Sequence, residues 1–215
     1  MTATRSLPIF ALPGVVLLPG TLLPLHIFEV RYRAMVADAL SGDKTIGMAL
    51  MKPGWEAGGR DPEIFSVGGA GEIVENERLE DGRYNILLKG RFRYRILREA
   101  AVHPYRKASV EEIVSLPFPD RTSEERARRR ATRLFGELRE EMDLAPLPEE
   151  DLSPERLASE IALRLRYGPA ELQAMLEIDS LPARIEALVD RLAEWRRRLL
   201  FLAPFRPEDL DPGRN

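Results

Sequence analysis

The sequence predicts an α+β fold, with a mostly β N-terminal part followed by about four helices. Before residue 120, short apolar runs are separated by Pro-Gly and Asp-Gly pairs, which is typical of strands joined by turns. After residue 120, apolar residues recur every three or four positions, which is typical of amphipathic helices. We therefore expect a β subdomain over residues 1–119, a helical subdomain over residues 120–204 and a tail over residues 205–215.

The β part begins with an uncharged stretch of 23 residues, SLPIFALPGVVLLPGTLLPLHIF (6–28), if His26 is neutral. Its length would suit a membrane helix, but prolines stand at positions 8, 13, 19 and 24. Each proline inside a helix costs about 3 kcal/mol, and the stretch lacks the unbroken apolar core and cleavage site of a secretory signal. We therefore expect a cytoplasmic protein without membrane contact, in which this stretch forms extended segments at 7–12, 15–18 and 22–28.

The remaining strands follow from local patterns. Apolar runs predict strands at 45–51, 65–74 and 108–114, and glycines at 68, 69 and 71 indicate a bulge or a close backbone approach. Asp81-Gly82 predicts a hairpin between 73–79 and 84–88. Alternation of Phe92, Tyr94 and Ile96 with arginines predicts a half-buried strand, and residues 29–40 have helical spacing.

The helical part has its own start signals and apolar stripes. Thr122 and Glu125 resemble a capping box before a stripe that runs from Ala127 to Met142. Ser153-Pro154 and Gly168-Pro169 start two further helices, the second of which we expect to end near Glu177. The fourth helix carries the regular seam Ile185, Leu188, Leu192, Trp195, Leu199 and Leu202, and we expect Trp195 to be core.

The composition excludes several functions. The 32 Lys and Arg nearly balance 35 Asp and Glu, so the net charge of −3 gives no general attraction to nucleic acid or anionic membranes. The sequence has no cysteine, which excludes disulfides, thiolate catalysis and cysteine-ligated zinc.

An ordered series of motifs carries a resemblance to a known family. The series comprises the proline-punctuated segments up to Pro24-Leu25, FSVGGAGEIV (65–74), LEDGRYNILLKGRFRYRI (79–96) and LASEIALRLRYGPAELQAMLEIDSLPARIEALVDRL (157–192). Over residues 6–202 the chain resembles the N-terminal substrate-binding domain of the ATP-dependent protease Lon. The resemblance implies a PUA-like β-pseudobarrel followed by a helical bundle, which binds unfolded or tagged protein segments. It also implies a recognition or adaptor role in proteolysis, with a separate protease or ATPase as partner.

No catalytic machinery is recognisable. SGDKT (41–45) lacks the upstream glycine of a phosphate-binding loop, and GGAG (68–71) lacks the third glycine of a dinucleotide fingerprint. The Ser-Lys protease domain of Lon would lie beyond residue 215. The two histidines fit packing for His26 and a loop position for His103. We therefore expect a stand-alone, non-catalytic domain with no cofactor, metal or catalytic residue.

For protein binding, the best candidate is the loop KPGWEAGGRDP (52–62), in which Trp55 is expected to be partly exposed. The alternative is that Trp55 folds back and caps the barrel. Met48 and Met51 precede this loop and could add an adaptable apolar surface, although a core position is the usual one. The other candidate contact residues are His26 and Phe28.

RNA binding is the less favoured alternative. Lys89, Arg91, Arg93 and Arg95 would share one face of an extended strand, and such a stripe can contact phosphates. These residues could equally protect a sheet edge from pairing. A second basic run near the start of the first bundle helix is offset by nearby glutamates; its members are Arg126, Arg128, Arg129, Arg130 and Arg133.

Overall fold

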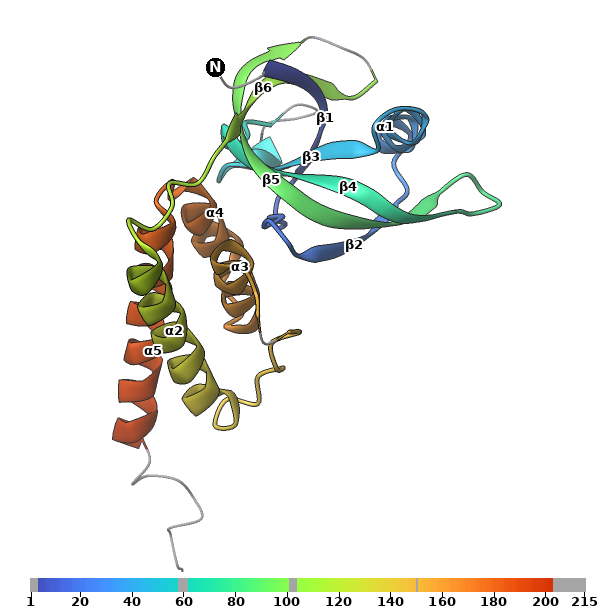
Figure 1. Cartoon of the computed structure of the whole chain (residues 1–215). Coiled ribbons are helices and arrows are strands. Elements are labelled where there is room, and N and C mark those ends of the chain that lie inside the picture. The colour runs from blue at the N-terminus through green and yellow to red at the C-terminus, as the bar shows by residue number, and fades with distance from the viewer. Residues whose placement is uncertain (1–3, 58–61, 101–103, 150, 203–215) are drawn as a thin grey trace, which may run out of the picture. The chain divides into compact units, whose positions relative to one another are not determined.

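The computed structural model describes residues 4–57, 62–100, 104–149 and 151–202 (Figure 1). His103, the loop glycines Gly58 and Gly59, and the tail expected over 205–215 lie outside these residues. The described chain is α+β, as predicted, with a six-stranded mixed sheet and helices α1 to α5. None of the described helices combines the length and the apolar character needed to cross a bilayer.

The strands form one sheet that closes on itself. They are β1 (Thr4–Leu12), β2 (Leu22–Ile27), β3 (Thr45–Leu50), β4 (Val67–Arg78), β5 (Tyr84–Ala100) and β6 (Arg106–Ile113). Their order is β2-β5-β4-β3-β1-β6, and β5 also pairs with β6. The 17 residues of β5 are long enough to pair with β2 at one end and with β6 at the other. Strands β5, β4, β3, β1 and β6 therefore form a closed ring, to which β2 is added.

Glycines allow the segment 15–18 to cross this sheet. The segment was expected to be a strand, but it is irregular, with Leu17 and Leu18 buried. A Cβ on Gly69 would lie 1.9 Å from the carbonyl oxygen of Leu17, and one on Gly90 would lie 2.1 Å from that of Leu18. The close backbone approach predicted from the glycine run is thus confirmed. The predicted bulge is also present, because the β4–β5 register shifts between Ala70 and Gly71.

Helix α1 (Val30–Ser41) covers one core of the β part. Its buried residues Tyr32, Met35, Val36 and Ala39 follow helical spacing, as predicted. They pack with Phe10, Leu17, Met48 and Leu88, among others. A second cluster includes Leu7, Ile9, Tyr94 and Val110.

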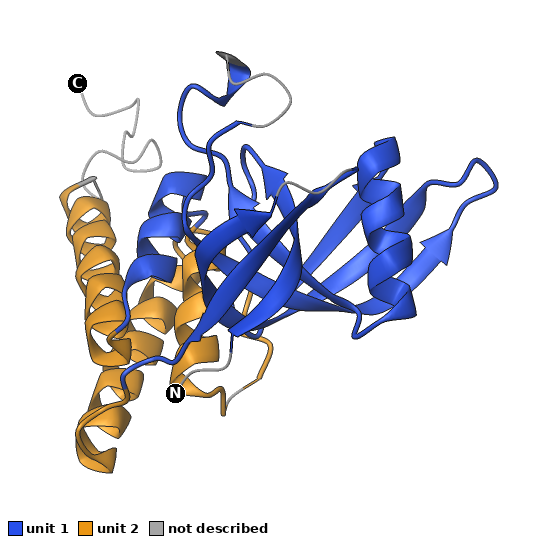
Figure 2. Ribbon diagram, turned by 90° about the horizontal axis from the view of Figure 1, so that it is seen from above, with its two compact units in different colours: residues 1–116, 166–179 blue, residues 117–165, 180–215 orange. Residues whose placement is uncertain are grey.

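The chain divides into two compact units (Figure 2). Unit 1 comprises residues 1–116 and 166–179, and unit 2 comprises residues 117–165 and 180–215. This division differs from the single boundary expected near residue 120, because α4 (Pro169–Glu177) belongs with the sheet. The amide nitrogen of Gln173, on α4, donates to the carbonyl oxygen of Val67, on β4, at 3.0 Å.

Unit 2 contains the helices α2 (Arg121–Arg139), α3 (Pro154–Arg164) and α5 (Leu181–Leu202). The predicted Ser153 cap is confirmed, because its hydroxyl accepts from the Arg156 amide. The predicted Thr122–Glu125 capping box is wrong. Helix α2 begins two residues earlier than predicted, with Asp120 as N-cap accepting from the Ser123 amide at 2.7 Å.

The predicted seam of α5 is buried only in its first half. Ile185, Leu188 and Leu192 are fully buried. Trp195 is half-buried rather than core, with the guanidinium groups of Arg191 and Arg198 within 6 Å of its ring. Leu200 and Phe201 are exposed, so the last turns of the helix extend beyond the buried core of unit 2.

Candidate functional site

Strand β2 presents apolar side chains to solvent. Its side chains alternate: Leu23 and Leu25 pack against the core, whereas Leu22, Pro24 and His26 are exposed. Phe28, directly after the strand, is 63% exposed, and Leu22 is 57% exposed. In the described sheet β2 pairs only with β5, and Pro24 has no N–H to offer to a further strand. The strand is therefore a sheet edge. Its exposed side chains are better suited to contact another molecule than its backbone is to pair with a further strand.

The neighbouring strand continues this surface. The register places Leu22 beside Lys89, Pro24 beside Leu87 and His26 beside Asn85. Paired residues share a face of the sheet, so half-buried Leu87 extends the apolar area inward. We call Leu22, Pro24, His26, Phe28 and Leu87 the β2 face.

Hydrogen bonds hold His26 in one orientation. Its Nε2 lies 3.1 Å from a guanidinium nitrogen of Arg83, which can only donate, so Nε2 accepts. Its Nδ1 therefore carries the proton and donates to the Asn85 side-chain oxygen at 2.8 Å. The ring stacks with Phe28 at 6.3 Å between centroids. His26 is thus exposed, whereas a partly buried position was expected. Its ring packs against one side of the Phe28 ring.

The other predicted protein-binding residues differ in exposure. Trp55 begins a 3-10 turn (Trp55–Ala57) and is 37% exposed, as predicted. Met51 is half-buried, but Met48 is 1% exposed and belongs to the core. Every residue of β3 is buried, because β3 lies between β4 and β1. The prediction that Met48 contributes to an apolar surface is therefore wrong.

The predicted basic stripe on β5 does not exist as one face. Lys89, Arg91 and Arg95 are exposed, but Arg93 is only 1% exposed. Phe92 pairs with Ala70 and Gly90 with Gly71, so Arg91 is the extra residue of a bulge and the alternation breaks there. Arg91 forms an ion pair with Glu72, and Arg95 lies 3.9 Å from Asp179.

Arg93 has a structural position inside unit 1. Its guanidinium donates to the carbonyl oxygens of Leu176 and Ile178, at 2.8 and 3.2 Å, and to Asp179 at 3.2 Å. A second nitrogen donates to the hydroxyl of Ser115 at 3.2 Å. These bonds tie β5 to the C-terminal end of α4, so Arg93 is unavailable to a phosphate.

The described residues show little that could perform catalysis. Among them, no three His, Asp or Glu side chains are grouped so that they could hold a metal ion. A cavity of about 150 Å³ lies beside Asp38, Asp43, Tyr105 and Lys107. The Tyr105 hydroxyl donates to Asp38 at 2.6 Å, and burial together with this bond raises the pKa of Tyr105. Tyr105 therefore stays protonated and is a poor base or nucleophile.

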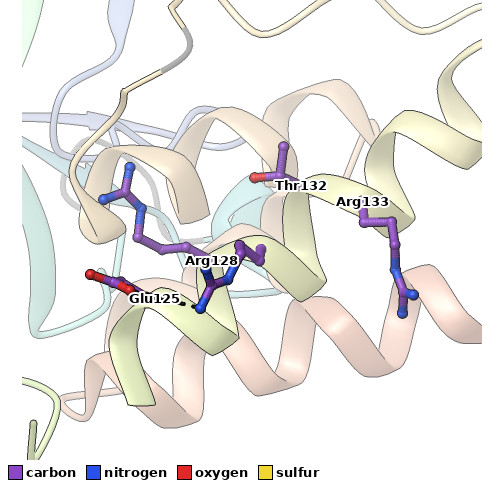
Figure 3. Close-up of a pocket in the computed structure, with 5 residues that line it drawn as sticks. Glu125, Arg128, Thr132 and Arg133 are labelled. Carbon is purple, nitrogen blue, oxygen red and sulfur yellow. Dashed lines mark ion pairs between the residues drawn. The ribbon is translucent and has the colours of Figure 1, made fainter. Parts of the chain in front are cut away.

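Unit 2 contains a second recess, which the sequence did not reveal. Two adjoining cavities of about 450 and 520 Å³ share Thr132 of α2. Figure 3 shows Glu125, Arg128, Thr132 and Arg133 placed along α2 around the first cavity. Both cavities together form what we call the α2 cleft, and its remaining lining residues are Arg129, Phe135, Gly136, Arg139, Leu147, Pro148 and Glu149.

Comparison with known proteins identifies related sequences and folds. The family model of the ATP-dependent protease La (LON) substrate-binding domain matches residues 6–194. Lon protease from Dictyoglomus thermophilum is 33% identical over 188 residues, which cover 84% of this chain and 23% of that protein. Lon protease 2 from Myxococcus xanthus is 29% identical over 209 residues, which cover 93% of this chain and 24% of that protein. The chain thus spans about a quarter of the length of these curated relatives.

Solved structures show the same fold. The N-terminal domain of a Mycobacterium avium complex Lon protease aligns with a TM-score of 0.67 and 17% identity, covering 88% of this chain and 98% of that one. A Lon N-terminal domain protein from Xanthomonas campestris aligns with a TM-score of 0.63 and 24% identity, covering 86% of this chain and 98% of that one.

Proposed function

Because the chain belongs to the ATP-dependent protease La (LON) substrate-binding domain family, we propose that it binds unfolded or tagged protein segments without catalysing a reaction. The observation that carries this proposal is the β2 face, where Leu22 and Phe28 are each more than half exposed beside Pro24 and Leu87. Large apolar side chains gathered on a rigid sheet are typical of protein contact sites.

The proposed fold type is a PUA-like β-pseudobarrel. The closed ring of β5, β4, β3, β1 and β6 supports this fold type, because a pseudobarrel is a sheet that closes on itself. The sixth strand, β2, is added to this ring and forms a sheet edge. In this arrangement β2 is anchored by its inward side chains, and its outward side chains remain free for a partner.

The β2 face suits short apolar segments of many sequences. Burying a Leu or Phe side chain contributes about 1.5–3 kcal/mol, so two such contacts give a modest affinity. His26 and Asn85 add polar groups at one end of the face. Trp55 is proposed as a separate, secondary contact.

The proposed cellular role is recognition for proteolysis in the cytoplasm. The relatives are called Lon protease and the family is that of an ATP-dependent protease, which supports cooperation with a protease or ATPase. RNA binding is not proposed, because burial of Arg93 breaks the basic stripe on which it depended.

Affinity measurements on matched leucine variants test this function. Leu22 on the β2 face and Leu97 on β5 are similarly exposed, at 57% and 53%. We expect Leu22→Ala with Phe28→Ala to weaken binding of a fluorescent, permanently unfolded model protein by at least about tenfold, or about 1.4 kcal/mol. Leu97→Ala should leave the affinity almost unchanged. Equal affinities for the double variant, the Leu97 variant and the parent chain would exclude the β2 face.

A further inference from the structure

Helix α2 is far more basic than the rest of the chain. The range Arg121–Arg139 has seven arginines and three glutamates, an excess of four positive charges, whereas the whole chain has a net charge of −3. Four of these arginines border the α2 cleft: Arg128, Arg129, Arg133 and Arg139. The cleft therefore combines a recess with a local positive charge.

The recess is open at a glycine. Gly136 lies within α2, and a Cβ built on it would meet no atom of the described residues within 4 Å, apart from its chain neighbours and its own helix backbone. Phe135, which is 2% exposed, lies next to it on the lining. Glycine is disfavoured inside a helix, and no close packing within the described chain requires it here. The space above Gly136 is thus free for a side chain from outside.

The wall opposite α2 is preformed. Arg164 donates to the carbonyl oxygen of Pro146 at 2.7 Å, and Arg156 donates to Glu149 at 3.0 Å. These bonds hold the segment that carries Leu147 and Pro148. Recesses of roughly 300–1,000 Å³ with fixed walls are of the size that binds ligands or side chains, and each cavity here falls in that range.

We propose that the α2 cleft binds an acidic protein segment, with an apolar side chain above Gly136 and carboxylates on the cleft arginines. Arg129 and Arg133 are 75% and 70% exposed, and their ion pairs with Glu125 and Glu137 are long, at 3.7 and 3.8 Å. Such exposed pairs contribute little, so a ligand carboxylate can replace them at small cost.

The lining favours protein over nucleic acid. Binding of single-stranded nucleic acid uses exposed aromatic rings for stacking, but Phe135 is buried. Glu125 and Glu149 also line the cleft, and each forms an ion pair with an arginine, Arg121 and Arg156 respectively. This surface lies in unit 2 and does not depend on the β2 face of unit 1.

Peptide binding to the full chain tests the proposal. The probe is a fluorescein-labelled peptide of Glu and Leu, compared by anisotropy with a peptide of equal length in which every Glu is replaced by Lys. The Glu peptide should bind, more weakly as salt is raised, and the Lys peptide should not. Gly136→Leu, which fills the recess, and Arg129→Gln with Arg133→Gln should each weaken binding by at least about fivefold.

A matched variant serves as the control. Arg126→Gln removes an exposed arginine of α2 that does not line the cleft. It should bind the Glu peptide within about twofold of the parent chain. If Gly136→Leu fails to fold, the double variant Arg129→Gln with Arg133→Gln still tests the proposal. Binding that is unchanged in every variant, or a preference for an oligothymidine probe over the Glu peptide, would overturn the proposal.

Discussion

Arg93 shows how one residue can change the apparent character of a strand. A buried guanidinium needs acceptors for its charge and its donors, and here carbonyl oxygens, Asp179 and Ser115 accept from its two terminal nitrogens. The planar fork of arginine has five N–H donors on three nitrogens, so it can reach acceptors that lie farther apart than the single ammonium nitrogen of a lysine can. Arg93, which in the sequence resembles part of a phosphate-binding stripe, thus connects β5 to the end of α4 by hydrogen bonds.

Replacing Arg93 tests this role. Arg93→Met removes every donor while keeping a long apolar stem, and we expect a loss of about 3–5 kcal/mol in the free energy of unfolding. Arg95→Met is the control, because Arg95 is exposed and lies 3.9 Å from Asp179; its loss should be below about 1 kcal/mol. Urea unfolding of the full chain measures both. Similar losses for the two variants would contradict the anchoring role.

At the scale of elements, two features of α2 affect its stability: the cap at its N-terminus and one interior glycine. Asp120 caps the first turn, where its carboxylate also interacts favourably with the helix dipole. The Ser123 hydroxyl donates back to the Asp120 carbonyl oxygen at 2.8 Å, which closes the turn. Thr122 lies inside the helix and has no such role in the cap.

The cap assignment predicts a difference between neighbouring alanine variants. Asp120→Ala should lower the free energy of unfolding by about 1 kcal/mol, because the Ser123 amide loses its acceptor. Thr122→Ala should change it by less than about 0.5 kcal/mol. Thermal and urea unfolding compare them directly. A larger effect at Thr122 would restore the capping box.

The glycine in α2 predicts a stabilising substitution. Gly136→Ala should raise the free energy of unfolding by about 1 kcal/mol, since alanine restricts the unfolded chain and its methyl group meets no neighbouring element among the described residues within 4 Å. Urea unfolding of the variant measures this gain. A loss of stability would mean that the space above Gly136 is occupied in solution.

At the scale of the whole molecule, the two units depend on contacts between distant parts of the chain. Unit 1 combines residues 1–116 with residues 166–179, which contain α4. Unit 2 combines residues 117–165 and 180–215, which lie on either side of α4 in the sequence. Within unit 1, the crossing of the segment 15–18 over Gly69 and Gly90 brings together three stretches far apart in sequence. Only glycine permits this approach, since any Cβ would overlap a backbone oxygen.

The crossing predicts a large effect from a single methyl group. Gly69→Ala should lower the free energy of unfolding by about 3 kcal/mol, because the backbone of the segment 15–18 must shift. For a chain of this size the melting temperature should fall by about 6–12 °C. Gly14→Ala is the matched control, since a Cβ there meets nothing within 4 Å. Equal melting temperatures for the two variants would show that the segment moves freely.

The sequence by itself determined the class of fold, nearly all elements, and the family. Proline and glycine spacing, apolar periodicity and the order of motifs are local properties, so they indicate strands, helices and the close approach near Gly69 without tertiary information. Trp55 could be predicted as partly exposed because its neighbours include turn-forming residues.

Only the tertiary structure decided which side chains reach solvent together. The bulge at Arg91 shifted the alternation and the end of α4 buried Arg93, a central position for β3 buried Met48, and packing on β4 assigned α4 to unit 1. The α2 cleft likewise needs the segment 144–149 beside α2. The exposure of a side chain depends on strand register and on neighbours distant in sequence. A hydrophobic period of two or 3.6 residues indicates a strand or a helix, but it specifies neither the register nor those neighbours.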